Sequence, residues 1–171
     1  MASIQSQQRV VPLQTADSEA RPLEVLAVID GSERAGRVIE YALGLAHAGR
    51  PLQIVLLGVV REPPEGRLRG YGSFKRDEVH ARLREACGRA VAAAARRLEQ
   101  EGVSHRDRVE VGDPVETILR VAREEGSDVI LVGDAPAGAV QRWLGRTIGL
   151  ALPTVATQVI QDATSPVVVV K

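Results

Sequence analysis

Short apolar runs recur along the chain, and between most of them apolar residues return every three or four positions. The runs at 23–29, 52–60 and 128–133 are rich in Val, Leu and Ile, which is typical of strands buried on both faces. Segment 107–111 alternates apolar and charged residues and predicts a short strand at a sheet edge. A last run, 166–170, predicts a fifth strand.

Helical spacing marks the segments between these strands. Ser32 is placed to cap a first helix and Gly49 to end it. A long helix is expected over about 77–101, a third begins with Asp113 as its N-cap, and a last begins with Thr154 as its N-cap. The expected inner faces, in chain order, are Ala35, Val38, Ile39, Ala42, Leu43 and Ala46; Val79, Leu83, Ala86, Cys87, Ala90, Ala94 and Leu98; Val115, Ile118, Leu119 and Ala122; and Val155, Val159 and Ile160.

The alternation of strands and helices predicts parallel strands joined by crossover helices. A length of 171 residues suits one domain. We expect an α/β fold in which a five-stranded, mostly parallel sheet forms a doubly wound α/β/α sandwich over 23–171, after a polar, flexible extension at 1–22. Sheets of this kind bind ligands beyond the carboxyl ends of their strands, where the strand order reverses.

Composition narrows the function classes. Lys plus Arg and Asp plus Glu number 22 each, so the chain lacks the basic footprint expected for general nucleic-acid binding. No apolar stretch approaches the ~20 residues of a membrane span, and the N-terminus lacks the pattern of a secretory signal. The lone cysteine, Cys87, cannot form an internal disulfide, which favours a reducing cytoplasm and a packing role on an apolar helix face.

Groups for catalysis or metal binding are sparse. His47, His80 and His105 have no partners at metal-ligand spacing and are expected at the surface. The G-x-S-x-G elbow of a serine hydrolase is missing, and no paired carboxylates stand out. We therefore expect neither a metal site nor an enzyme.

Two loops compete for the ligand crevice. Asp30 ends the first strand, where its carboxylate can accept a hydrogen bond from a ligand; alternatively, Asp30 and Ser32 only organise the turn and cap the helix. Gly133 ends the fourth strand, where backbone N–H groups can approach a phosphate. Neither loop carries a G-x-G-x-x-G or a G-x-x-x-x-G-K-[ST] signature, so spacing alone does not decide.

Three segments together resemble the universal stress protein family of the UspA type: LEVLAVIDGSERAGRVIEYALGLA, GDPVETILRVAREEGSDVILVG and TVATQVIQDATSPVVVVK. The resemblance covers roughly residues 23–171. It is specific at the acidic residue after the first strand, at the Gly-x-Pro helix entry and at the SPVVVV segment. It implies the strand order 3-2-1-4-5, a cytoplasmic location and a homodimer paired antiparallel through the last strand. The interface would then be formed by Pro166, Val167, Val168, Val169 and Val170.

The same resemblance bears on ATP, which some members of the family bind and others do not. Binders carry G-x2-G-x9-G-[ST] after the fourth strand; Gly133 matches the first glycine, but the second falls on Pro136. The final Gly-[ST] falls on Arg-Thr at 146–147 by direct counting, or on Pro-Thr at 153–154 if the following helix is aligned. We prefer the second alignment because it keeps the distance from the helix cap to the last strand. Proline lacks the N–H that a phosphate cradle needs, so the motif is degenerate.

The base side of the motif is better preserved. By resemblance, Asp30 meets adenine or ribose and Val59 lines the adenine pocket. Gly138 and Gly145 belong to an inserted segment, and they would serve ATP only in a remodelled loop. A retained nucleotide site would comprise Asp30, Val59, Val132, Gly133, Gly138, Gly145, Thr154 and Val155.

Three functions follow from these observations. The first, which we favour, is a non-enzymatic stress-response regulator that acts as a dimer and binds ATP weakly or not at all. The second is an ATP-binding member of the family that acts as a nucleotide-dependent switch. The third is an adaptor that docks a protein partner through the inserted segment 138–152, where Trp143 lies on an apolar stripe. That stripe can equally pack on the protein's own core.

Overall fold

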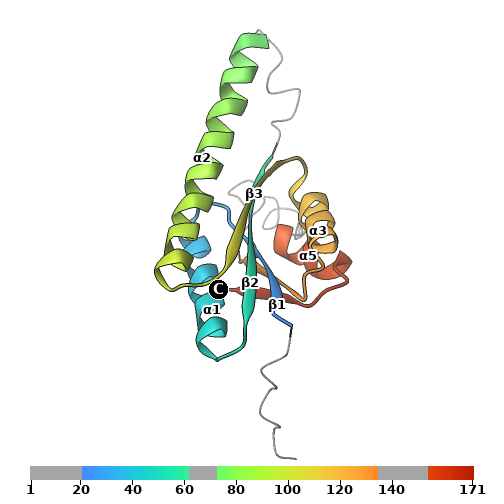
Figure 1. The fold of residues 1–171 in the computed structure, drawn as a ribbon. Coiled ribbons are helices and arrows are strands. Elements are labelled where there is room, and N and C mark those ends of the chain that lie inside the picture. The colour runs from blue at the N-terminus through green and yellow to red at the C-terminus, as the bar shows by residue number, and fades with distance from the viewer. Residues whose placement is uncertain (1–20, 62–72, 135–153) are drawn as a thin grey trace, which may run out of the picture.

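The protein is a sheet covered by helices on both faces (Figure 1). The computed structural model describes residues 21–61, 73–134 and 154–171. The elements are β1 Leu23–Val28, α1 Glu33–His47, β2 Leu52–Val60, α2 Ser73–Gln100, β3 His105–Val111, α3 Pro114–Glu124, β4 Val129–Gly133, α5 Val155–Asp162 and β5 Val167–Val170. The predicted extension, 1–22, lies outside the described residues except for its last two.

The five strands follow the order β3-β2-β1-β4-β5, and every neighbouring pair is parallel. The predicted fold class and strand order are therefore confirmed. Each predicted strand agrees with the observed one within two residues, and β3 is an edge strand as its alternating pattern predicts. The parallel arrangement brings the carboxyl ends of all five strands to one edge of the sheet.

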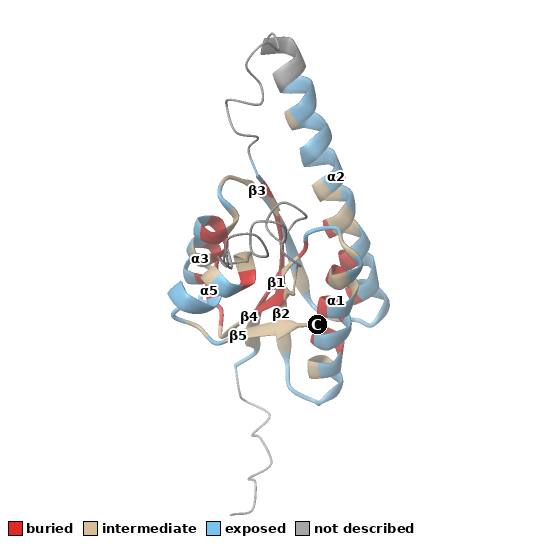
Figure 2. Cartoon of the chain, turned by 180° about the vertical axis from the view of Figure 1, so that it is seen from behind, coloured by how far each residue is buried: buried red, intermediate tan, exposed pale blue. Residues whose placement is uncertain are grey.

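The core has two parts, one on each face of the sheet, and buried residues line both layers (Figure 2). Helices α1 and α2 cover one face, where Val38 and Leu98 are fully buried. Helices α3 and α5 cover the other, where Ile118 and Val159 are buried. Successive residues of β1 point to opposite faces of the sheet and so enter the two core layers in turn. A strand that is buried on both faces therefore needs a continuous apolar sequence.

Two of the predicted inner faces need correction. Along α2, Val79, Leu83 and Ala86 are exposed, with Val79 at 36% and Leu83 at 40%. This part of α2 projects past the ends of β2 and β3, so no sheet lies beneath it (Figure 1). On α5, Ile160 is 51% exposed because the short helix buries only Ala156 and Val159.

Helix α2 lies close to the sheet at one point, Gly58 of β2. A Cβ atom built there would overlap Sγ of Cys87 and lie 2.8 Å from Cγ2 of Val91. Cys87 is half-buried, and desolvation raises the pKa of its thiol. The predicted packing role of Cys87 fits this position, since a raised pKa disfavours the reactive thiolate.

An ion-pair network joins the edge strand β3 to α3. The guanidinium of Arg108 donates to Glu110 at 2.6 Å, to Glu125 at 2.8 Å and to Glu124 at 3.0 Å. Hydrogen bonding by Arg108 holds the pKa of Glu110 below its usual value, and hydrogen bonds from Arg120 and Arg108 do the same for Glu124. Charged side chains on an edge strand also discourage pairing with other chains.

Within the described residues, no helix is both long and apolar enough to cross a membrane. The same residues contain no cluster of three or more His, Cys, Asp or Glu side chains that could hold a metal ion.

Candidate functional site

The central feature is a cavity of about 160 Å³ at the carboxyl edge of the sheet. It opens at the point where the strand order reverses. From β1 the chain adds β2 and β3 on one side, and it then crosses to add β4 and β5 on the other side of β1. Five predicted site residues line this cavity: Asp30, Val59, Val132, Gly133 and Val155. The remaining lining residues are Val28, Ile29, Pro114, Ile118 and Ala156.

The walls of the cavity come from two helices as well as from the strand ends. Pro114 and Ile118 lie on the first turns of α3, which begins there because Asp113 accepts hydrogen bonds from the N–H groups of Val115 and Glu116. Val155 and Ala156 lie on the first turn of α5. Pro114 and Ile118 were not predicted as site residues, although the Asp-Pro helix start directly after β3 marks their place at this edge.

Asp30 is the one charged residue among the described residues that line this cavity. Its Oδ1 accepts hydrogen bonds from the N–H and the hydroxyl of Ser32, at 3.0 and 2.6 Å, across Gly31, whose φ is +75°. Ser32 in turn caps α1 by accepting a hydrogen bond from the N–H of Arg34 at 3.3 Å. Oδ2 of Asp30 has no partner among the described residues. Asp30 therefore organises the turn, and none of the described residues uses its second carboxylate oxygen.

Gly133 serves helix packing at the same time as it borders the cavity. A Cβ built on it would lie 3.2 Å from Cβ of Arg34 and 3.9 Å from Cγ2 of Val38, both on α1. The missing side chain therefore faces α1, whereas the cavity lies on the α3 and α5 side of the sheet. Close packing against α1 is therefore a reason for a glycine here that does not depend on a ligand.

Thr154 lies beside the cavity as the N-cap of α5. Its hydroxyl accepts a hydrogen bond from the N–H of Thr157 at 3.2 Å and lies 3.0 Å from the Thr157 hydroxyl. The predicted residues Gly138 and Gly145, the segment 138–152 and the prolines at 136 and 153 lie outside the described residues.

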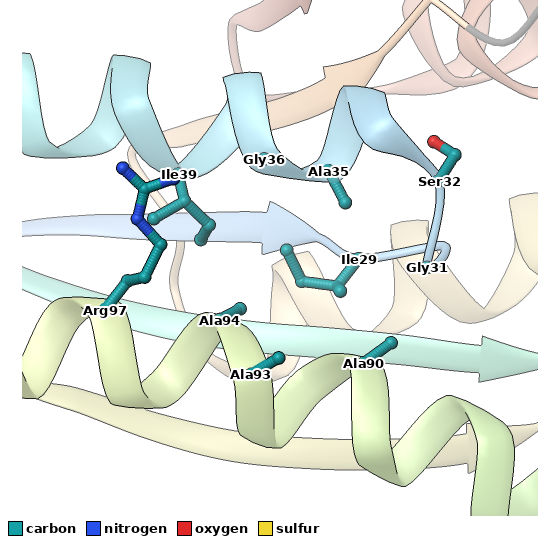
Figure 3. Close-up of a pocket in the computed structure, with 10 residues that line it drawn as sticks. All are labelled: Ile29, Gly31, Ser32, Ala35, Gly36, Ile39, Ala90, Ala93, Ala94 and Arg97. Carbon is teal, nitrogen blue, oxygen red and sulfur yellow. The ribbon is translucent and has the colours of Figure 1, made fainter.

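Two further hollows adjoin this site. One, of about 450 Å³, shares Ile29, Asp30 and Val59 with the first and extends under α2 toward Leu83. The other, of about 190 Å³, runs between α1 and α2 (Figure 3). Small side chains such as Ala35 and Ala94 line it, and Arg97 stands at one end.

The 160 Å³ cavity has few polar groups. Among the described residues its lining is apolar apart from Asp30 and backbone groups, and it includes no His, Cys, Ser or Lys side chain. Among the described residues, the histidines lie elsewhere: His47 is 3.5 Å from Glu101, and Nδ1 of His105 is 3.1 Å from the Val103 carbonyl.

The predicted interface residues form the second edge of the sheet, β5. The carbonyl of Pro166 accepts a hydrogen bond from the N–H of Ile130 on β4, and that of Val170 accepts one from Asp134 just after β4, both at 2.9 Å. Since successive residues of a strand direct their N–H and C=O groups to opposite sides, those of Val167 and Val169 point to the open edge. No described strand pairs with that edge, and all four valines of β5 are partly exposed.

Comparison with known proteins agrees with this architecture. A protein called MJ0577, studied as a test case of structure-based assignment of biochemical function, is 27% identical with a TM-score of 0.64; the alignment covers 87% of this chain and 95% of that one. UspA from Lactobacillus plantarum is 20% identical with a TM-score of 0.61, over 89% and 99% of the two chains. A universal stress protein from Archaeoglobus fulgidus, solved in complex with dAMP, is 22% identical with a TM-score of 0.57, over 88% and 98%.

Curated protein sequences yielded no match. The model of the universal stress protein family, in contrast, matches residues 24–171, nearly the whole chain. With its parallel sheet in the order β3-β2-β1-β4-β5, the chain belongs to the universal stress protein family.

Proposed function

We propose that the protein is a non-enzymatic, cytoplasmic stress-response regulator that acts as a dimer and binds adenine nucleotides weakly. In this proposal the crevice keeps the half of the site that holds the base, and it has lost most of the half that holds the phosphates. The observation that carries the proposal is the single apolar cavity shared by Asp30, Val59, Val132, Gly133 and Val155.

The base half rests on shape and polarity. A cavity of about 160 Å³ is large enough for one planar ring system. Ligand sites combine apolar walls with a few placed polar groups, and the free Oδ2 of Asp30 is such an acceptor for an amine or a hydroxyl. The dAMP complex of the Archaeoglobus fulgidus protein makes adenine nucleotides the first ligands to test.

The phosphate half rests on the sequence. Backbone N–H groups of a glycine-rich loop are what hold a phosphate at such a crevice. Pro136 and, in the preferred alignment, Pro153 replace two glycines of the family motif, and proline has no N–H to donate. We therefore expect the β- and γ-phosphates of ATP to add little affinity.

The dimer rests on the open edge of β5. A flat, apolar edge strand is a template for pairing with another chain, and folded proteins normally cover it. Val167 and Val169 direct outward backbone groups that no described strand pairs with, and a second copy of β5 in antiparallel orientation would satisfy them. Light scattering of the purified protein would measure the subunit number, and a monomer at micromolar concentration would contradict this part of the proposal.

Calorimetric titration with adenosine, AMP and ATP tests the nucleotide site. We expect dissociation constants of about 0.1 mM or weaker, with AMP and ATP within about threefold of each other. Asp30→Asn keeps an oxygen for Ser32 but removes the charge, and it should weaken all three ligands by about tenfold. Asp107→Asn, on the far edge strand, is the matched control.

Two results would overturn this assignment. If ATP binds more than about tenfold more tightly than AMP, the phosphate site is intact and the protein is a nucleotide-dependent switch. If none of the three ligands binds, the crevice is not a nucleotide site. Incubation with Mg-ATP should yield no ADP, and steady hydrolysis would contradict the non-enzymatic part.

A further inference from the structure

We propose that the hollow of about 450 Å³ under α2 holds an apolar group carried on the phosphate of an adenine nucleotide. The crevice would then prefer a phosphodiester of AMP to AMP itself. This inference rests on the proposed nucleotide site. In it the base lies in the 160 Å³ cavity, and the rest of the ligand crosses the carboxyl ends of β1 and β2 to the α2 side of the sheet.

The hollow and the cavity meet at the ends of β1 and β2. Ile29, Asp30 and Val59 line both of them. From there the cavity continues toward α3 and α5, whereas the hollow continues along α2 on the opposite face of the sheet. A ligand longer than one ring system can therefore reach from one into the other over this pair of strand ends.

The far wall of the hollow is an apolar stripe of α2, where the helix runs past the strand ends (Figure 1). Leu83, Ala86, Cys87 and Ala90 form this wall. Leu83 is 40% exposed, so a group seated in the hollow would remove apolar surface from water. A hollow of about 450 Å³ with apolar walls and few polar groups has the size and lining that small-molecule sites usually have.

Two side chains of opposite charge, Asp30 and Arg61, also line the hollow. Arg61 directly follows β2, is exposed and forms no ion pair with another described residue. A ribose hydroxyl can donate to Asp30, and a phosphate can accept two parallel hydrogen bonds from the guanidinium of Arg61. This pairing puts the phosphate on the α2 side of the strand ends, away from the loop after β4, in which Pro136 has no N–H to donate.

The walls beyond Arg61 suit an apolar group better than further phosphates. Arg61 is the one cation among the described residues that line the hollow, so a second phosphate finds no partner of opposite charge there. An aliphatic or aromatic substituent, in contrast, gains free energy from burial against α2. One arginine serves one phosphate, which agrees with the small gain expected for ATP over AMP.

Calorimetric titration of the full chain with the methyl and phenyl phosphoesters of AMP tests the hollow. The two esters carry the same charge and differ in apolar size, and the phenyl ester should bind about tenfold more tightly. Leu83→Gln should remove most of this preference and leave adenosine affinity unchanged. Val79→Gln is the matched control, because Val79 is 36% exposed on the same stripe, one turn further out, and does not line the hollow.

Arg61→Gln tests the phosphate contact. It should weaken AMP and both esters by about tenfold and leave adenosine unchanged, whereas Arg61→Lys should keep part of the affinity. Arg82→Gln removes an exposed pair with Glu78 at 2.6 Å outside the hollow and should change nothing. If Arg61→Gln binds AMP as the wild type does, the phosphate does not lie at Arg61 and the proposed path of the ligand is wrong.

The outcomes separate this inference from the nucleotide site itself. If adenosine and AMP bind but the two esters bind equally, the nucleotide site stands and the hollow holds no part of the ligand. If Leu83→Gln weakens adenosine as much as the phenyl ester, Leu83 supports the shape of the crevice and the apolar subsite is wrong. If the wild-type protein binds none of these ligands, both proposals fail.

Discussion

Gly133 and Arg34 meet where β4 passes under the first turn of α1, and a Cβ on the glycine would lie 3.2 Å from Cβ of the arginine. That spacing is tighter than ordinary van der Waals contact, so a side chain at position 133 fits only if its neighbours on α1 give by a few tenths of an ångström. One residue thus satisfies two requirements, close packing of a helix and access to the crevice. A variant at Gly133 therefore cannot by itself reveal phosphate binding.

Gly133→Ala should lower the free energy of unfolding by about 1 kcal/mol, because it forces α1 outward in a packed core. Urea denaturation followed by circular dichroism measures this change. Gly44→Ala is the matched control: it lies within α1, nothing stands within 4 Å of its Cβ, and it should stabilise the helix by about 0.5–1 kcal/mol. Equal effects of the two substitutions would show that the contact with Arg34 has no energetic weight.

Gly58→Ala should be more damaging, at about 2–3 kcal/mol, because its Cβ would overlap Sγ of Cys87 and approach Val91. Cys87→Ala removes the sulfur, so the double variant should be less destabilised than the sum of the two single variants. A coupling of about 1 kcal/mol in the denaturation cycle would show that the two residues meet. Strict additivity would mean that α2 moves away from β2 as a whole.

The strands and most helix starts could be predicted from the sequence, since buried parallel strands need continuous apolar runs and caps need particular residues. The strand order followed from the resemblance to the universal stress protein family. The exposure of the outward half of α2 could not be predicted. Val79 and Leu83 continue the helical stripe of Leu98, but periodicity does not tell where the sheet beneath a helix stops. The predicted burial of Ile160 was wrong for a related reason, because only the tertiary contacts of a short helix decide which residues it buries.

The candidate site was predictable to the extent that topology determines it. Asp30, Val59 and Gly133 end neighbouring strands, and parallel strands bring those ends together. The contact of Gly133 with Arg34 was not predictable, because a glycine after a strand indicates phosphate access and helix packing equally well.

Stability should decrease in acid through the network of Arg108. Hydrogen bonds hold the pKa values of Glu110 and Glu124 below their usual value of 4.5. A lowered pKa in the folded state means that the stabilisation is present above pH 4.5 and is lost as the pH falls through the folded-state value. Arg108→Gln should cost about 1–2 kcal/mol at pH 7, and this difference from the wild type should shrink below pH 4.5.

Urea denaturation at pH 7, 5 and 3.5 measures that difference. Arg89→Gln removes an exposed pair with Glu85 at 2.5 Å and is the matched control, because such pairs contribute little. If the cost of Arg108→Gln is the same at every pH, the ion pairs of the network do not contribute to stability.

Pairing through β5 can be tested without touching the rest of the sheet. The backbone N–H of Val169 points to the open edge, whereas that of Val168 points toward β4, so proline has opposite consequences at two adjacent positions. Val169→Pro removes a donor needed only by a partner strand and should yield a folded monomer. Val168→Pro removes a hydrogen bond to β4 and should lower the melting temperature sharply. Light scattering gives the subunit number and circular dichroism the fold. A Val169→Pro protein that is still dimeric would place the interface on another surface.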